Sequence, residues 1–112
     1  MAKVIITEDL AEEINKKLKG ESVKIFELMY SLKENPRKGK FVGQVNGIVI
    51  KELKYKKFRF YFITKGFKLK FLSIQELSDL LIKFVRISDK KSQQRTIDEI
   101  KHVLKIFGEK EF

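Results

Sequence analysis

The spacing of apolar residues, which changes near residue 47, constrains the fold of this chain most strongly. Upstream, apolar residues recur at intervals of three to four and predict amphipathic helices. Downstream, residues 58–63 alternate, so that Phe58, Phe60 and Phe62 point to one side of a strand and the residues between them to the other. Helices are therefore expected before residue 36, and a sheet in the centre of the chain. We expect the Phe side chains to form core beneath the helices.

The 112 residues fit one domain. The predicted elements, in chain order, are a strand at 2–6, helices at 8–19 and 22–34, a basic loop at 36–47, strands at 48–54, 58–63, 67–73 and 80–87, and a helix starting at 96. Thr7 is a candidate N-cap, Thr96 begins a capping box with Glu99, and Gly20 and Gly108 are expected to end helices. The pattern predicts an α+β fold: a mainly antiparallel sheet of four to five strands, with two N-terminal helices and one C-terminal helix packed on one face.

Composition excludes several classes of site. The chain has no cysteine, so disulfides, thiolate zinc sites and thiol nucleophiles are excluded. The single histidine, His102, does not suffice for a histidine-based metal site and is expected at the surface. No metal or other cofactor is expected. No apolar run approaches the roughly 20 residues that span a bilayer, so we expect a soluble cytoplasmic protein without a membrane partner.

The positive charge is concentrated in one third of the chain. The net charge is +10, and residues 33–70 contain twelve basic and two acidic side chains. A localised positive field favours phosphate-rich partners such as nucleic acid. The alternative is a solvated lysine-rich surface, which also suits a thermophilic protein.

Two basic segments could contact RNA. The first lies on the expected strands and comprises Lys54, Lys56, Lys57, Arg59, Tyr61, Lys68 and Lys70. On a face free of helices, these cations would meet phosphates while the Tyr61 ring stacks on a base. The second is the segment 86–95, whose cations and amides could grip phosphate and ribose. The alternatives are a sheet face that serves only solubility and, for the second segment, a polar capped loop. The acidic residues do not suggest a catalytic pair, because Glu52 lies on a strand and Asp79 and Asp89 lie in loops.

Part of the chain resembles a known family. The residues that carry the resemblance are Asn35-Pro36 after a helix, Gly39, Gly43 and Gly47 in the following segment, and the strand Phe58-Arg59-Phe60-Tyr61-Phe62. In this order they resemble the RelE/ParE toxin superfamily. The stretch Phe84-Val85-Arg86, followed by Lys90-Lys91-Ser92-Gln93 and a helix, is similar to the HigB branch of that superfamily.

The resemblance implies a RelE-like fold and a toxin of a type II toxin–antitoxin pair. Such a toxin cleaves mRNA on the ribosome by attack of the ribose 2′-hydroxyl, without a metal. A cognate antitoxin would inhibit it and set its oligomeric state. The catalytic residues implied are Arg59, Lys57, Lys54, Arg86 and Lys91. The RNA-binding residues expected are Tyr61, Lys56, Lys68, Lys70, Lys90 and Gln94. Two alternatives remain at this point: a ParE-type toxin that inhibits DNA gyrase, and a non-catalytic RNA-binding module on the same scaffold.

Overall fold

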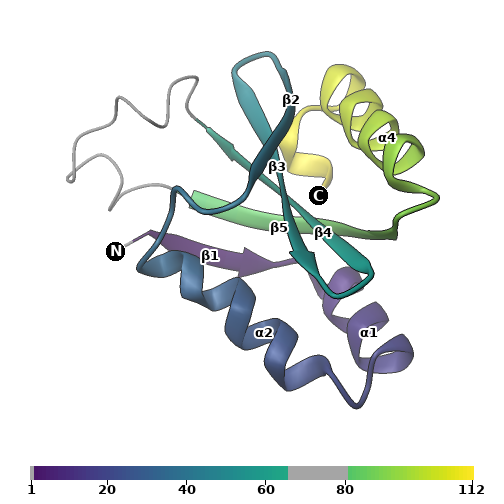
Figure 1. Cartoon of the computed structure of the whole chain (residues 1–112). Helices are drawn as coiled ribbons and strands as arrows, with labels where there is room; N and C mark the ends of the chain where they lie inside the picture. Colours follow the sequence, from purple (N-terminus) through teal and green to yellow (C-terminus); the bar gives the residue numbers. More distant parts are fainter. Residues whose placement is uncertain (1, 66–80) are drawn as a thin grey trace.

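The computed structural model describes residues 2–65 and 81–112 (Figure 1). Its elements are β1 (Lys3–Ile6), α1 (Glu8–Lys17), α2 (Ser22–Tyr30), the 3-10 helix η1 (Ser31–Lys33), β2 (Lys40–Val45), β3 (Ile48–Tyr55), β4 (Phe58–Lys65), β5 (Leu81–Asp89), α4 (Gln93–Ile106) and the 3-10 helix η3 (Glu109–Glu111). The predicted α+β class is confirmed, with two N-terminal helices, one C-terminal helix and a five-stranded sheet. The strand predicted at 67–73 lies outside the described residues.

The five strands follow the order β1-β5-β4-β3-β2. All neighbours are antiparallel except β1, which runs parallel to β5. Lys54 pairs with Arg59 across β3 and β4, and Arg59 pairs with Ser88 across β4 and β5. Directly opposite residues of antiparallel strands point to the same face of the sheet. The register therefore places these three residues in one row across the sheet.

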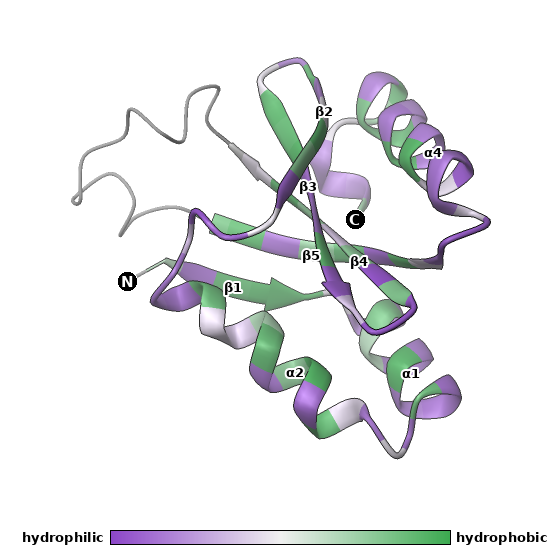
Figure 2. Cartoon of the chain, in the orientation of Figure 1, coloured by the Kyte–Doolittle hydropathy of each residue, from purple (hydrophilic) through white to green (hydrophobic). Residues whose placement is uncertain are grey.

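Helices α1 and α2 cover one face. Leu10 and Ile14 of α1 and Ile25 of α2 are buried in one cluster with Phe60 and Phe62 of β4. The alternating hydrophobic and hydrophilic bands along these helices are visible in Figure 2. The prediction that the Phe stripe of β4 forms core is confirmed, since Phe60 and Phe62 have no exposed surface.

Helix α4 covers the opposite face, so the prediction of helices on a single face was wrong. Ile97, Ile100 and Leu104 of α4 pack against a second buried cluster that includes Tyr61 and Ile63. Figure 1 shows α4 on the other side of the sheet from α1 and α2. The physical reason is that this face is polar only near the strand ends. Farther along the strands it carries apolar side chains that need cover from water.

The segment 36–47, predicted as a loop, contains β2 and forms a hairpin with β3. Val45 pairs with Ile48, which leaves Asn46 and Gly47 as the two turn residues. Their φ angles are 49° and 83°. Two-residue hairpin turns with positive φ at both positions favour Asn-Gly. The dipeptide Asn46-Gly47 was therefore the sequence signal that could have predicted this hairpin.

The boundaries of the first helix agree in part with the predictions. Thr7 is the N-cap of α1, because its hydroxyl accepts a hydrogen bond from the Leu10 N–H at 3.4 Å. The helix ends at Lys17, earlier than Gly20, and Leu18 is its C-cap.

The final helix begins at Gln93, three residues before the predicted start at Thr96. Asp89 accepts hydrogen bonds from the N–H and the hydroxyl of Ser92, which shapes the turn that leads into α4. The Thr96 hydroxyl donates back to the Ser92 carbonyl at 2.9 Å, as threonines inside helices do. Gly108 follows α4 with a φ of 78°, and its expected place at the helix end is confirmed.

Candidate nucleic-acid interface

A group of polar side chains lies between the ends of β3, β4 and β5 and the first turn of α4. We call it the strand-end cluster, and its members are Glu52, Arg59, Tyr61, Ser88 and Gln93. The sheet register brings four of them together, because Glu52 pairs with Tyr61 and Arg59 pairs with Ser88. Gln93 joins them from α4.

Arg59 is held in a nearly buried ion pair. Its Nε lies 3.0 Å from Oε1 of Glu52, and the two side chains are 11% and 6% exposed. Gln93 Nε2 donates to both carboxylate oxygens at 3.0 Å. Arg59 Nη1 is buried, and no atom of residues 2–65 and 81–112 accepts a hydrogen bond from it. Glu52 thus orients the guanidinium, but Nη1 remains a buried donor without an acceptor among these residues. Buried donors are normally hydrogen-bonded, so we expect an additional acceptor.

Tyr61 does not have the accessibility that base stacking requires. It is fully buried beneath α4, and its hydroxyl lies 2.8 Å from the Ser88 hydroxyl. Burial raises the pKa of Tyr61. The expectation that Tyr61 lies on an open face and stacks on a base was therefore wrong, because α4 covers that face.

Arg86 is bound to α4. Its Nε donates to Glu99 Oε1 at 2.8 Å and its Nη1 to the Val85 carbonyl at 2.9 Å. Its guanidinium also lies over the Phe112 ring, 4.9 Å from the centroid. Glu99, which the sequence suggested as part of a capping box, serves this ion pair instead. Arg86 thus joins the sheet to α4 rather than standing free for RNA.

Four predicted cations are exposed near the strand-end cluster: Lys54, Lys57, Lys90 and Lys91. Lys54 stands opposite Arg59 in the register, and Lys57 Nζ lies 5.5 Å from the centroid of the adjacent Phe58 ring. Lys68 and Lys70 lie outside the described residues. The structure therefore places Lys54 opposite Arg59 on one face of the sheet, Lys57 in the β3–β4 turn over Phe58, and the two remaining lysines in the turn before α4.

Two other predicted RNA-binding residues are engaged within the protein. Lys56 Nζ donates to Glu21 Oε1 at 2.6 Å, and the Tyr55 hydroxyl donates to the second oxygen of the same carboxylate. The hydrogen bonds from Lys56 and then Tyr55 hold the pKa of Glu21 below its usual value. Gln94 donates to Asp98, one turn farther along α4. Lys56 thus fastens the β3–β4 turn to the segment between α1 and α2.

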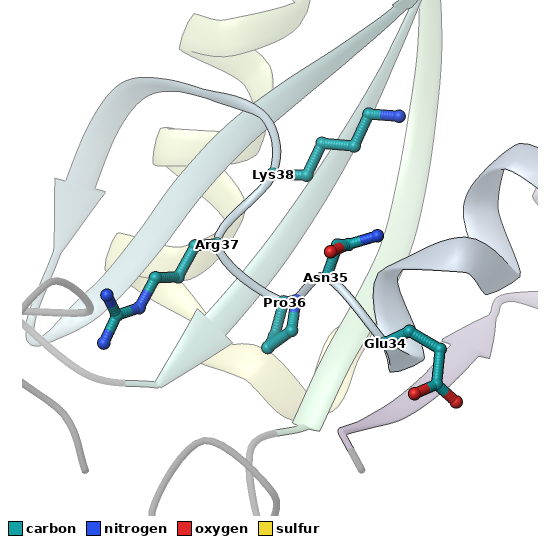
Figure 3. A pocket seen from close by; sticks show the side chains of 5 residues that line it. All are labelled: Glu34, Asn35, Pro36, Arg37 and Lys38. Atoms are coloured by element: carbon teal, nitrogen blue, oxygen red, sulfur yellow. The ribbon is translucent and has the colours of Figure 1, made fainter. Parts of the chain in front are cut away.

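A pocket of about 510 Å³ lies beside the segment between η1 and β2 (Figure 3). Its lining residues are Glu34, Asn35, Pro36, Arg37 and Lys38. The buried Lys51 of β3 donates from Nζ to the Arg37 carbonyl at 2.8 Å and so ties this segment to the sheet. Burial lowers the pKa of Lys51.

The lowered pKa of Lys51 predicts a pH dependence of stability. Below the folded-state pKa, the Lys51 amine is charged in both states, and its burial lowers stability. As the pH rises from that value towards 10.5, the unfolded state binds more protons than the folded state, so this penalty disappears. The free energy of unfolding of the wild type, minus that of Lys51→Met, is expected to rise over this window in urea titrations. A difference that is flat or falls with pH would contradict the assignment.

Sequence reasoning missed Glu52 and Gln93. The hairpin turn at Lys56 and Lys57 was the available signal for Glu52. A two-residue turn there places Lys54 opposite Arg59, and Glu52 next to both on the same face. No local signal marked Gln93, since its contact with Glu52 depends on where α4 docks.

The part of the chain described here contains no helix long and apolar enough to cross a membrane. Within residues 2–65 and 81–112, no three His, Asp or Glu side chains gather as they would around a metal ion. His102 is exposed, as expected. No known protein family, curated protein or solved structure matches this chain.

Proposed function

We propose that this protein is the toxin of a type II toxin–antitoxin pair, a ribosome-dependent endoribonuclease that cleaves mRNA without a metal. The observation that carries the proposal is the Arg59 guanidinium, oriented by Glu52, with an unused Nη1 donor, beside exposed lysines. Arginine is well suited to phosphate because it offers several donors in a fixed plane. Since Nη1 is shielded in the free protein, RNA binding requires a local movement of the side chains that cover it.

The chemistry fits these residues. The ribose 2′-oxygen attacks the adjacent phosphorus, the bond from phosphorus to the 5′-oxygen breaks, and a cyclic phosphate and a 5′-hydroxyl result. Arg59 would stabilise the negative charge that develops on the phosphoryl oxygens. A general base must lie within hydrogen-bond reach of the 2′-hydroxyl. We assign this role to Lys54, opposite Arg59 in the sheet, and assign protonation of the leaving 5′-oxygen to Lys91.

The proposed partners follow from charge and from the resemblance. A net charge of +10 favours a polyanionic substrate and an antitoxin with acidic segments. The antitoxin would set the oligomeric state, and the pair would act in the cytoplasm on ribosome-bound mRNA. No cofactor takes part in the proposed reaction.

The decisive experiment incubates the protein with translating ribosomes and maps new RNA 5′ ends. We expect cuts in phase with codons, carrying 5′-hydroxyl groups, and no cuts in the same mRNA without ribosomes. Intact mRNA would contradict the nuclease. Intact mRNA together with inhibition of DNA supercoiling would indicate the ParE-type activity instead.

A second candidate function is RNA binding without cleavage. It is favoured by the engagement of both candidate arginines with carboxylates, Arg59 with Glu52 and Arg86 with Glu99. In that case the protein would bind RNA with the same lysines, and no new 5′ ends would form.

Both candidates predict the same salt dependence of RNA binding. Replacing Lys54, Lys57 and Lys91 together with glutamine is expected to flatten the plot of log K against log salt by about 2, because each lost contact to single-stranded RNA removes about 0.7. Fluorescence anisotropy with a labelled oligonucleotide measures this slope. A control variant with glutamine at the exposed Lys3, Lys105 and Lys110, which belong to the start of β1, the last turn of α4 and η3, should keep it. Equal slopes for the two variants would show that Lys54, Lys57 and Lys91 do not contact the RNA.

A further inference from the structure

A pocket of about 290 Å³ lies where β4 begins and β5 ends, against the C-terminal part of α1. Leu18, Phe58 and Ile87 give it an apolar lining. Its charged lining residues are the acidic Glu13 of α1 and Asp89 at the end of β5, together with the basic Lys17 of α1. Pockets for drug-sized ligands measure roughly 300–1,000 Å³, so this one suits a single ring system. The proposed cleavage chemistry does not use it.

The pocket adjoins the strand-end cluster. Phe58 directly precedes Arg59 in β4, and Ser88, which also lines the pocket, stands opposite Arg59 in the register. Side chains alternate along a strand, so Phe58 and Arg59 point to opposite faces of the sheet. Lys57 Nζ lies over the Phe58 ring. An RNA strand that crosses this end of the sheet can thus meet a cation on one side and the pocket on the other.

We propose that this pocket binds a guanine base of the RNA whose phosphates contact Lys57 and Arg59. The proposal rests on the proposed function and adds to it a determinant of substrate specificity.

The choice of guanine follows from the carboxylates. An ionised carboxylate only accepts hydrogen bonds and does so through two oxygens. Guanine alone among the four RNA bases presents two adjacent donors on its pairing edge, the N1–H and the 2-amino group. Adenine, cytosine and uracil place an acceptor beside each donor on that edge, which a carboxylate would repel.

Asp89 is the better-positioned carboxylate. Its Oδ1 already accepts both the N–H and the hydroxyl of Ser92, at 2.9 and 2.8 Å, which fixes the orientation of the group and leaves Oδ2 as the oxygen that would accept from guanine. The same hydrogen bonds hold the pKa of Asp89 below its usual value, so the group is charged at neutral pH. Glu13 pairs with the exposed Lys17 at 3.2 Å and can turn towards a ligand. The Phe58 ring offers a surface on which a base can pack.

The first test uses free nucleotides and does not depend on cleavage. In ¹H–¹⁵N spectra of the protein titrated with GMP, AMP, CMP or UMP, we expect GMP to shift the amides of Leu18, Ile87 and Asp89 and to bind at least tenfold more tightly than the others. Asp89→Asn keeps the acceptor for Ser92 but removes the charge, so it should abolish the preference. Glu12→Gln, the same charge change on α1 at a residue that does not line the pocket, should keep it. Equal binding of the four nucleotides, or shifts confined to other residues, would overturn the proposal.

The second test separates a base within RNA from a free guanine nucleotide. A heptamer of uridines with one central guanosine should bind at least fivefold more tightly than the all-uridine heptamer, and Asp89→Asn should equalise them. GMP binding without a preference between heptamers would assign the pocket to a free nucleotide and overturn the proposal for RNA. Because neither test requires cleavage, a guanine preference in a protein that leaves mRNA intact would support the pocket and reject the nuclease.

Discussion

Replacing Arg59 with alanine is expected to lower the free energy of unfolding by about 3–5 kcal/mol, because the substitution leaves Glu52 buried without its counter-charge. Gln93 would still donate to Glu52, but an amide does not neutralise a carboxylate. The measurement is chemical denaturation in urea. For a domain of this size, the loss corresponds to a fall in the melting temperature of more than 10 °C.

Two further variants test the cause. Lys54→Ala removes an exposed cation beside Arg59 in the sheet and should change the stability by no more than about 0.5 kcal/mol. Adding Glu52→Gln to Arg59→Ala removes the unpaired buried charge and should recover part of the lost free energy of unfolding. A double variant no more stable than Arg59→Ala alone would show that packing, and not charge, accounts for the loss.

The ion pair changes how Arg59 must be tested in the proposed reaction. Loss of cleavage in Arg59→Ala would reflect unfolding as well as chemistry. Arg59→Lys keeps a cation next to Glu52, and circular dichroism can establish that it is folded before its cleavage rate is measured. A folded Arg59→Lys variant with undiminished cleavage would show that the guanidinium is not required for the reaction.

Gly39→Ala is expected to destabilise the protein by roughly 2–4 kcal/mol. Gly39 has a φ of 108°, where a side chain is strained by about 1–3 kcal/mol. A Cβ atom there would also lie 2.9 Å from Cζ of Phe62 and 3.2 Å from the carbonyl oxygen of Glu52. The Phe62 ring is fully buried and lacks room to move aside, so crowding adds to the strain.

Gly20→Ala is the matched control for this substitution. Gly20 does not have a positive φ, and apart from Gly20 and its two chain neighbours no atom of the described residues lies within 4 Å of the position a Cβ would take. Alanine should therefore leave the stability unchanged or raise it by about 0.4–1 kcal/mol, through the entropy of the unfolded chain. Thermal denaturation of both variants distinguishes the two sites. Equal melting temperatures would contradict the strain argument at Gly39.

Local patterns identified most elements of the sheet and helices. The alternation in residues 58–63 located β4, and Thr7 marked the start of α1, because these signals act between residues close in sequence. The hairpin at Asn46 and Gly47 was also readable from its turn residues, although the basic and glycine-rich character of the segment favoured a loop. The start of α4 was not readable in this way. The helix begins before the apparent cap at Thr96, because the hydrogen bonds from Ser92 to Asp89 shape the turn that precedes it.

The sequence predicted only part of the candidate site. Concentrated charge and strand alternation identified Arg59 and its neighbouring lysines as a group. The burial of Tyr61 and the pairing of Arg86 with Glu99 depend on α4 packing on a face that the strand pattern had suggested was open.

The order of residues along this chain by itself determined the secondary structure of the central strands, the α+β class and the concentration of positive charge near the β3–β4 turn. Only the tertiary structure decided which of those charges face water. A side chain's partners across a sheet or beneath a helix come from distant parts of the chain, and burial makes pairing with them obligatory. For this reason Arg59 lies against Glu52 and Gln93, while Lys54, its neighbour across the same hairpin, remains exposed.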